Sequence, residues 1–148
     1  MKQIALILPL FLMSNAIMAQ TNGIADYQTE GDSIPLALNG LTGDPESGRS
    51  IVSNRQKGLC LLCHSGPFPE ERFQGNLAPS LKGAGSRSSI GQLRLRMVDS
   101  QQVNKESIMP AYHKIDALNL VAPAFQNKPI LTAQEVEDVL AYVITLKE

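Results

Sequence analysis

Only two cysteines occur in the 148-residue chain, and with the next histidine they form the pattern Cys60-x-x-Cys63-His64. Residues three apart lie on one side of a helical turn, so both thiols can form thioethers with the two vinyl groups of one haem while His64 reaches the iron. A structural zinc site needs four ligands, usually in two pairs, and no second pair exists. A redox dithiol is expected within a βαβ pattern, which this sequence lacks. The motif therefore predicts one covalently bound haem c, with His64 as an axial ligand.

The second axial ligand has three candidates outside residues 1–19, namely Met97, Met109 and His113. Met97 lies on the apolar face of a predicted helix, where core packing is the expected role. Met109 precedes a proline, which favours extended backbone, and an extended loop can place a thioether opposite His64. His113 would instead give bis-histidine iron, or lie solvated at the surface. We expect Met109, and either ligand would saturate the iron and make the haem an electron carrier, with a higher potential for a thioether than for a second imidazole.

Residues around the haem are less well determined by the sequence. A metal-bound histidine normally donates its other ring N–H to a carboxylate or carbonyl, and the Pro79 carbonyl is the candidate acceptor for His64. A simple turn proline is the alternative. Arg87, Arg94 and Arg96 are candidates for pairing with haem propionates, although charged residues on a helix usually form a solvated face. Nothing in the sequence selects one of the three arginines.

Residues 1–19 match a secretory signal peptide. Lys2 supplies a positive start, residues 4–12 form an apolar stretch, and cleavage after Ala19 or Ala16 fits the pattern. A transmembrane anchor needs about 20 apolar residues, so this stretch is too short. We expect an exported, periplasmic protein without a membrane anchor, which agrees with the haem motif because c-type haems are attached on the outer face of energy-transducing membranes.

The net charge of the chain excludes functions that need a strongly basic protein. The formal net charge of −1 becomes −2 when residues 1–19, which contain one lysine and no acid, are removed. Neither value suits a nucleic-acid partner or a polybasic membrane surface. About 130 residues then remain, which is enough for one domain. With both cysteines committed to haem, no disulfide is expected.

The elements that must position these residues are helices. Residues 20–43 show no sustained period and predict an irregular extension that docks on the body as a strap or contacts a partner, through Leu36, Leu38 and Leu41. The haem domain occupies residues 44–148. Asp44 and Pro45 begin its first helix, which is expected to end near Gly58.

Two capping boxes mark later helices. Ser89 and Gln92 begin a helix with an apolar face at Ile90, Leu93, Met97 and Val98. Thr132 and Glu135 begin the final helix, with an apolar stripe at Val136, Val139, Leu140, Val143 and Ile144. Proline-rich loops between the haem motif and residue 81 must wrap one edge of the porphyrin. No strand pattern of useful length occurs, so we expect an all-α single domain.

The order of parts resembles class I cytochromes c, and more closely the SoxX subunit of the SoxAX cytochromes of sulfur-oxidising bacteria. The resemblance spans about residues 33–147 and rests on Gly48-Arg49, Asn54–Gln56, Gly58–Ser65, Asn76–Leu81, Ile108–Tyr112 and Pro129–Thr132. Where that family usually has a second aromatic residue after the tyrosine, this chain has His113. The resemblance implies a class I cytochrome c-like fold with His64 and Met109 as iron ligands.

The resemblance also implies a function. SoxAX complexes oxidatively couple thiosulfate to a cysteine of a sulfur-carrier protein in the periplasm, and the haem that meets the substrate belongs to the partner, SoxA. A SoxX-like chain would therefore have no catalytic residue of its own and would pass electrons from a SoxA-like subunit to a downstream acceptor, as part of a heteromeric L-cysteine S-thiosulfotransferase. The alternative is a free monohaem shuttle. The near-neutral net charge of this chain argues against a shuttle, because shuttles often use charge to steer docking. The N-terminal extension favours a fixed partner.

Overall fold

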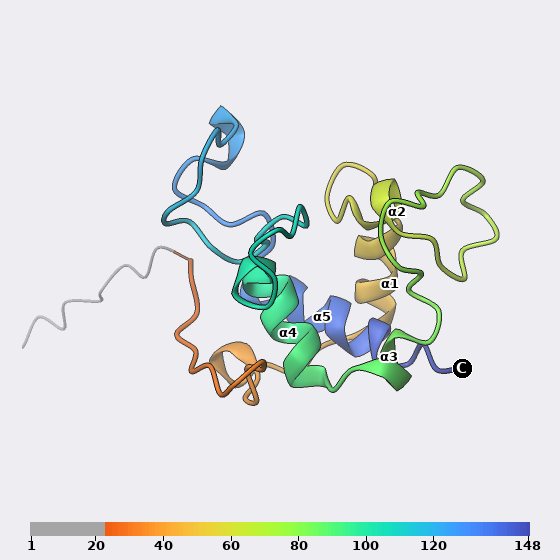
Figure 1. Cartoon of the computed structure of the whole chain (residues 1–148), viewed down its shortest axis with the longest axis horizontal. Coiled ribbons are helices and arrows are strands. Elements are labelled where there is room, and N and C mark those ends of the chain that lie inside the picture. The colour runs from red at the N-terminus through yellow and green to blue at the C-terminus, as the bar shows by residue number, and fades with distance from the viewer. Residues whose placement is uncertain (1–22) are drawn as a thin grey trace, which may run out of the picture.

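The computed structural model describes residues 23–148, so the predicted signal peptide lies outside the described part of the chain. Its helices are α1 (Pro45–Ser53), α2 (Cys60–Cys63), α3 (Ala84–Arg87), α4 (Ile90–Asp99) and α5 (Ala133–Val143), with 3-10 turns at Leu38–Gly40, Ser100–Gln102 and Pro123–Phe125. Within residues 23–148 the only β-type pairing is an isolated bridge between Glu30 and Ser33. The prediction of an all-α domain is confirmed. Figure 1 shows α5 running between α1 and α4, with α2 beyond the end of α1.

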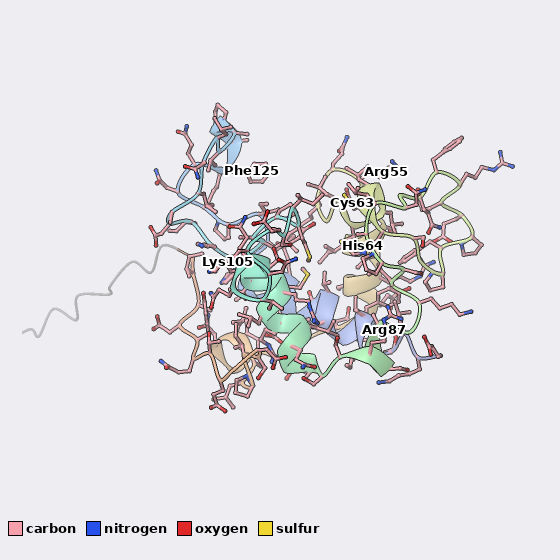
Figure 2. The ribbon with its side chains drawn as sticks, viewed as in Figure 1. Arg55, Cys63, His64, Arg87, Lys105 and Phe125 are labelled. Atoms are coloured by element: carbon pink, nitrogen blue, oxygen red, sulfur yellow. The ribbon has the colours of Figure 1, made fainter. Side chains whose placement is uncertain are left out.

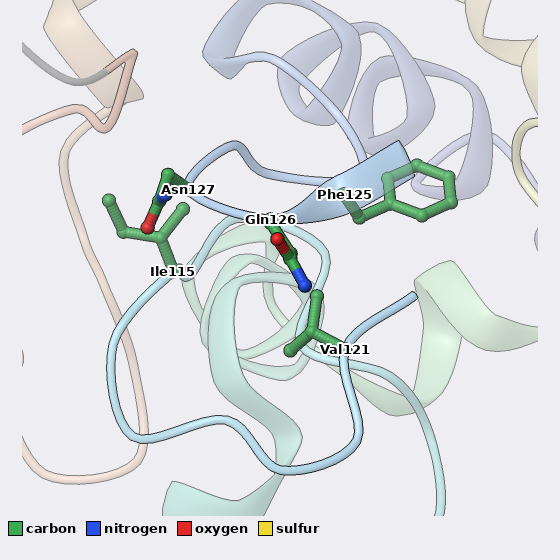
Figure 3. A pocket seen from close by; sticks show the side chains of 5 residues that line it. All are labelled: Ile115, Val121, Phe125, Gln126 and Asn127. Atoms are coloured by element: carbon green, nitrogen blue, oxygen red, sulfur yellow. The ribbon is translucent and has the colours of Figure 1, made fainter. Parts of the chain in front are cut away.

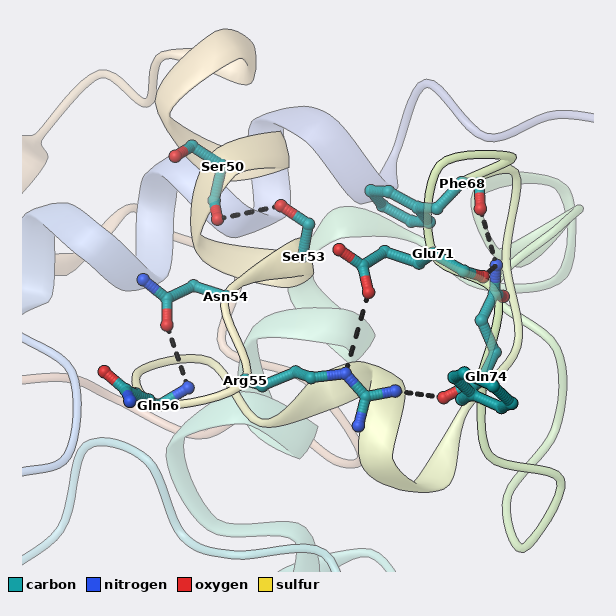
Figure 4. Close-up of polar contacts among 9 residues, drawn as sticks. Ser50, Ser53, Asn54, Arg55, Gln56, Phe68, Glu71 and Gln74 are labelled. Carbon is teal, nitrogen blue, oxygen red and sulfur yellow. Dashed lines mark hydrogen bonds and ion pairs between the residues drawn. The ribbon is translucent and has the colours of Figure 1, made fainter.

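Helix α1 begins as predicted but ends earlier. The Asp44 carboxylate accepts hydrogen bonds from the backbone N–H groups of Glu46 and Ser47, which caps the helix. The end expected near Gly58 lies instead at Ser53. The side-chain oxygen of Asn54 accepts hydrogen bonds from the N–H of Gln56 at 2.8 Å and of Lys57 at 3.0 Å. This local turn replaces the helical hydrogen bonds, and Figure 4 shows it between α1 and α2.

Helix α5 packs directly against α1, and a glycine permits the close approach. A Cβ atom on Gly48 would lie 1.9 Å from the Asp138 carbonyl oxygen, so no larger residue fits without moving a helix. Thr132 and Glu135 form the predicted capping box at the start of α5. Four residues of the predicted apolar stripe are buried: Val136, Val139, Leu140 and Val143.

Helix α4 buries the later residues of its predicted apolar stripe, Met97 and Val98, but not the first one. Its capping box at Ser89 and Gln92 is present, but Ile90 is exposed. The buried positions include Gly91, Arg94, Leu95, Met97 and Val98. The apolar pattern does not predict the burial of Arg94, which is paired with Glu137 of α5. The expectation that Met97 packs in the core is confirmed.

Residues 23–43, here called the strap, are irregular apart from one 3-10 turn and dock on the body. Ile34 and Leu38 are buried, and Leu41 packs partly against the core. Leu36 does not dock, because its side chain points to solvent and is 77% exposed. The Arg94 guanidinium donates to the Ile34 carbonyl at 2.7 Å. Among the helices of residues 23–148, none is long and apolar enough to cross a membrane.

Candidate functional site

The two cysteines lie in a single helical turn. Leu59, in the left-handed conformation with φ of 60°, turns the chain into α2, whose first and last residues are Cys60 and Cys63. Both thiols are free and half-buried. The chain becomes extended at His64, whose N–H still bonds to the Cys60 carbonyl at 2.9 Å. One short segment therefore presents two reduced thiols and an imidazole, and Figure 2 labels Cys63 and His64 within it.

The imidazole of His64 is oriented by the following loop. Its Nδ1 lies 2.6 Å from the Pro79 carbonyl oxygen, and because a carbonyl only accepts, Nδ1 is the donor. This fixes the tautomer and makes Nε2 the nitrogen with a free lone pair. The loop is held in place by a hydrogen bond from the Ala78 N–H to the Cys63 carbonyl at 3.0 Å. The contact is the one that the sequence suggested for Pro79.

Gln74 organises the loop between His64 and Pro79. Its side-chain oxygen accepts from the Gly66 N–H at 2.6 Å, and its side-chain nitrogen donates to the carbonyls of Phe68 at 2.8 Å and Glu71 at 3.0 Å. Figure 4 draws Gln74 against Phe68 inside this loop. Sequence reasoning missed this residue, because one glutamine among loop residues carries no spacing signal.

Two hydrogen bonds made by its backbone hold Met109 in place. Its N–H bonds to the hydroxyl of Ser107 at 3.3 Å, and its carbonyl accepts from the hydroxyl of Ser100 at 2.8 Å. Its side chain is partly buried and packs against the core. The residue is therefore fixed in a loop that the end of α4 supports, with an apolar thioether as its only side-chain donor to a metal.

His113 is buried and both of its ring nitrogens are hydrogen-bonded, so the surface position considered from the sequence is wrong. Its exposed fraction is 0%. Its Nδ1 donates to the Leu131 carbonyl at 2.9 Å, and its Nε2 accepts from the Ala25 N–H at 3.0 Å. Binding iron would require breaking one of these buried hydrogen bonds. In the structure the imidazole links the strap to the segment that precedes α5.

The three candidate arginines differ in their hydrogen-bond partners. Arg94 is committed to Glu137 inside the protein. Arg87 donates to the carbonyls of Lys82 at 2.7 Å and Ser80 at 2.6 Å, beside the loop that carries Pro79. Arg96 donates to the Ser88 hydroxyl at 2.9 Å. Arg94 is therefore removed from the candidates for pairing with a haem propionate.

Burial controls the ionisation of the cysteine segment. Burial raises the pKa of the Cys60 thiol to about 11, although a hydrogen bond with Tyr112 works in the opposite direction. Burial also raises the pKa of the Tyr112 hydroxyl well above its ordinary value. Both groups are therefore neutral at physiological pH when no metal or haem is bound.

The donor set fits a c-type haem. Two free thiols in one helical turn, an imidazole with Nδ1 donated to a carbonyl, and a thioether in a supported loop are the groups that such a haem uses. A separate cavity of about 190 Å³ contains none of them. It lies in the loop after residue 114 and is lined by Ile115, Val121, Phe125, Gln126 and Asn127 (Figure 3).

Comparison with solved structures places the chain in a family. The crystal structure of SoxXA from P. pantotrophus contains a chain with 34% sequence identity and a TM-score of 0.76, and the match covers 82% of the present chain and 95% of that chain. The chain belongs to the SoxX family. The predicted class I cytochrome c-like fold is thereby confirmed. No protein-family model and no curated protein sequence matches this SoxX-family chain.

Proposed function

We propose that this chain is the monohaem electron-transfer subunit of a periplasmic SoxXA-like complex, which oxidatively couples thiosulfate to a cysteine of a carrier protein. The observation that carries the proposal is the hydrogen bond from His64 Nδ1 to the Pro79 carbonyl, directly after two free thiols in one turn. This arrangement leaves Nε2 available to a metal. Membership of the SoxX family supports the partner and the pathway of electrons.

Each residue has a defined task in this proposal. Cys60 and Cys63 would anchor one haem c by thioethers, and His64 and Met109 would coordinate its iron. Pro79 holds the His64 ring in orientation through its carbonyl. A haem held in this way supplies one-electron transfer and has no open coordination position for substrate.

The residues that transform thiosulfate are assigned to a SoxA-like partner. Joining a carrier thiol to thiosulfate forms one S–S bond and releases two electrons and one proton, so the complex needs an electron acceptor. This chain supplies no catalytic residue in the proposal, because its cysteines and axial ligands are all committed. A downstream acceptor then takes the electrons. Export by residues 1–19 would bring the chain to the periplasm, where the partner is expected.

Haem attachment is tested on the protein purified from a host with a c-type maturation system. Acid–acetone extraction should leave the haem on the polypeptide, and a pyridine haemochrome assay should give one haem per chain. Cys60→Ala and Cys63→Ala should each keep one thioether and shift the haemochrome α band to longer wavelength. Complete extraction of haem from the wild type would contradict covalent attachment.

The division of labour is tested with a carrier protein, thiosulfate and an electron acceptor. The chain alone should not form the cysteine S-thiosulfonate, whereas the chain purified together with a SoxA-like subunit should form it. Size-exclusion chromatography should show the two subunits eluting together. Turnover by the chain alone would contradict the proposal, and an isolated chain that never binds a second haem protein would indicate a free shuttle.

A further inference from the structure

Tyr112 connects the methionine loop to the cysteine segment. Its hydroxyl donates a buried hydrogen bond of 2.6 Å to the carbonyl of Gly58, a residue 54 positions away. Gly58 lies two residues before Cys60, and its position is tightly determined because a Cβ there would lie 2.1 Å from the Ile51 carbonyl oxygen. Tyr112 lies three residues after Met109, and its ring is 3% exposed. One side chain thus joins the segments that carry the two proposed axial ligands.

The other hydrogen bonds of the methionine loop lead elsewhere. Ser100 donates to the Met109 carbonyl, and the Tyr112 N–H donates to the Met97 carbonyl at 2.9 Å, so both bonds hold the loop to α4 and the turn after it. Among the described residues, the hydrogen bonds between residues 105–114 and residues 54–64 all involve the Tyr112 hydroxyl, which donates to the Gly58 carbonyl and also interacts with the Cys60 thiol. Removing this hydroxyl should therefore loosen the loop relative to the cysteine segment and leave it attached to α4.

Thioether formation should increase the importance of this hydrogen bond. In the structure, the Gly58 carbonyl also accepts a weak hydrogen bond from the Cys60 thiol at 3.3 Å. Addition of the thiol to a vinyl group consumes the S–H, so this donor is lost when haem is attached. The Tyr112 hydroxyl would then be the remaining side-chain donor to a buried carbonyl, whose desolvation is costly without a partner.

We propose that Tyr112 is a positioning residue that holds Met109 at its bonding distance from the haem iron. The proposal rests on the ligand set put forward under the proposed function. The hydroxyl bond sets the spacing between the methionine loop and the haem-bearing segment, so its loss lets the thioether dissociate more readily. Tyr112 does not contact the iron in this proposal and acts only through the loop.

The test compares the haem-loaded wild type with Tyr112→Phe. Phenylalanine keeps the ring and its packing, so the fold should be retained, and thermal unfolding checks this. Imidazole is added to the oxidised proteins, and the sulfur-to-iron charge-transfer band reports displacement of the thioether. Tyr112→Phe should bind imidazole roughly three- to tenfold more tightly, the factor expected for one lost hydrogen bond. The band should also be weaker before imidazole is added.

Tyr142→Phe is the matched control. Tyr142 is also buried, at 9% exposure, and lies on α5 outside the methionine loop. This variant should leave the imidazole affinity unchanged even if it lowers the unfolding temperature.

The outcomes separate the two proposals. If the wild type shows the band and Tyr112→Phe binds imidazole like the wild type, the positioning role is wrong and the ligand set stands. Equal tightening in both variants would also contradict the positioning role, because it would reflect general destabilisation. A wild type without the band would contradict Met109 ligation itself, and with it the role of Tyr112.

Discussion

Arg94 and Glu137 form a bidentate ion pair inside the protein. The distances are 2.7 Å from Nε to Oε1 and 2.9 Å from Nη2 to Oε2, and both side chains are 3% exposed. Glu137 Oε1 also accepts from the Leu38 N–H at 2.9 Å, and Arg94 donates to the Ile34 carbonyl. The pair therefore joins α4, α5 and the strap through one network.

Breaking this pair from one side should be strongly destabilising. Arg94→Met leaves the Glu137 carboxylate buried without its partner, so we expect a loss of about 3–5 kcal/mol in the free energy of unfolding, measured with urea. Arg94→Met with Glu137→Leu should cost less than the sum of the single changes. Arg96→Met, on the same helix but only partly buried, is the control and should cost under about 1 kcal/mol. Equal losses at both arginines would contradict a special role for the pair.

Met109 and His113 should differ in their effects on the iron. Met109→Ala should abolish the sulfur-to-iron charge-transfer band and lower the reduction potential by part of the roughly 0.8 V range that axial ligands control. His113→Ala should keep the band, because both ring nitrogens bond to backbone groups. It should instead lower stability by about 2–4 kcal/mol, because it creates a cavity and leaves two buried backbone groups unpaired.

Absorption spectra, potentiometric titration and urea unfolding of the two variants decide this point. Met97→Leu, a conservative change at a core position, should alter neither the band nor the potential. If His113→Ala changes the spectrum and Met109→Ala does not, the iron is bis-histidine and the assignment of Met109 is wrong.

Gly48 should tolerate no side chain. In Gly48→Ala the new Cβ would meet the backbone of Asp138, so α1 and α5 must separate. We expect a loss of about 3 kcal/mol or more, visible as a lower unfolding midpoint. Ser50→Ala, on the exposed side of the same helix, should change stability by under about 0.5 kcal/mol. A stable Gly48→Ala protein would show that this helix contact is looser than the structure describes.

The capping box of α5 should make stability depend on pH. Burial works to raise the pKa of Glu135, but hydrogen bonds from Lys57 and from the Thr132 backbone outweigh it and hold the pKa below its ordinary value of 4.5. A carboxyl with a lowered folded-state pKa stabilises the protein above its unfolded-state pKa and loses this contribution as the pH falls through the folded-state value.

Glu135→Gln tests that dependence, because glutamine can keep the capping hydrogen bond but not the charge. At pH 7 the variant should be less stable by about 0.5 kcal/mol, the usual size for a partly exposed ion pair. The difference should vanish in acid, below the folded-state pKa. A difference that persists unchanged at low pH would assign the effect to the hydrogen bond and not to the charge.

The local features of this chain could be read from its sequence. The cap at Asp44 and the capping boxes at Ser89 and Thr132 are confirmed, because each closes hydrogen bonds within three residues and needs no other part of the chain. The spacing of Cys60 and Cys63 is likewise a property of one helical turn. Such interactions depend on sequence order alone, so their patterns carry over directly to the structure.

Only the tertiary structure decided the contacts of His113, Arg94 and Tyr112. Their partners lie 88, 43 and 54 residues away, at Ala25, Glu137 and Gly58. Sequence patterns place polar side chains at the surface, because burying one without a partner is costly. That cost disappears only where the fold brings a matching donor or acceptor from a distant segment, and no local spacing records where that happens.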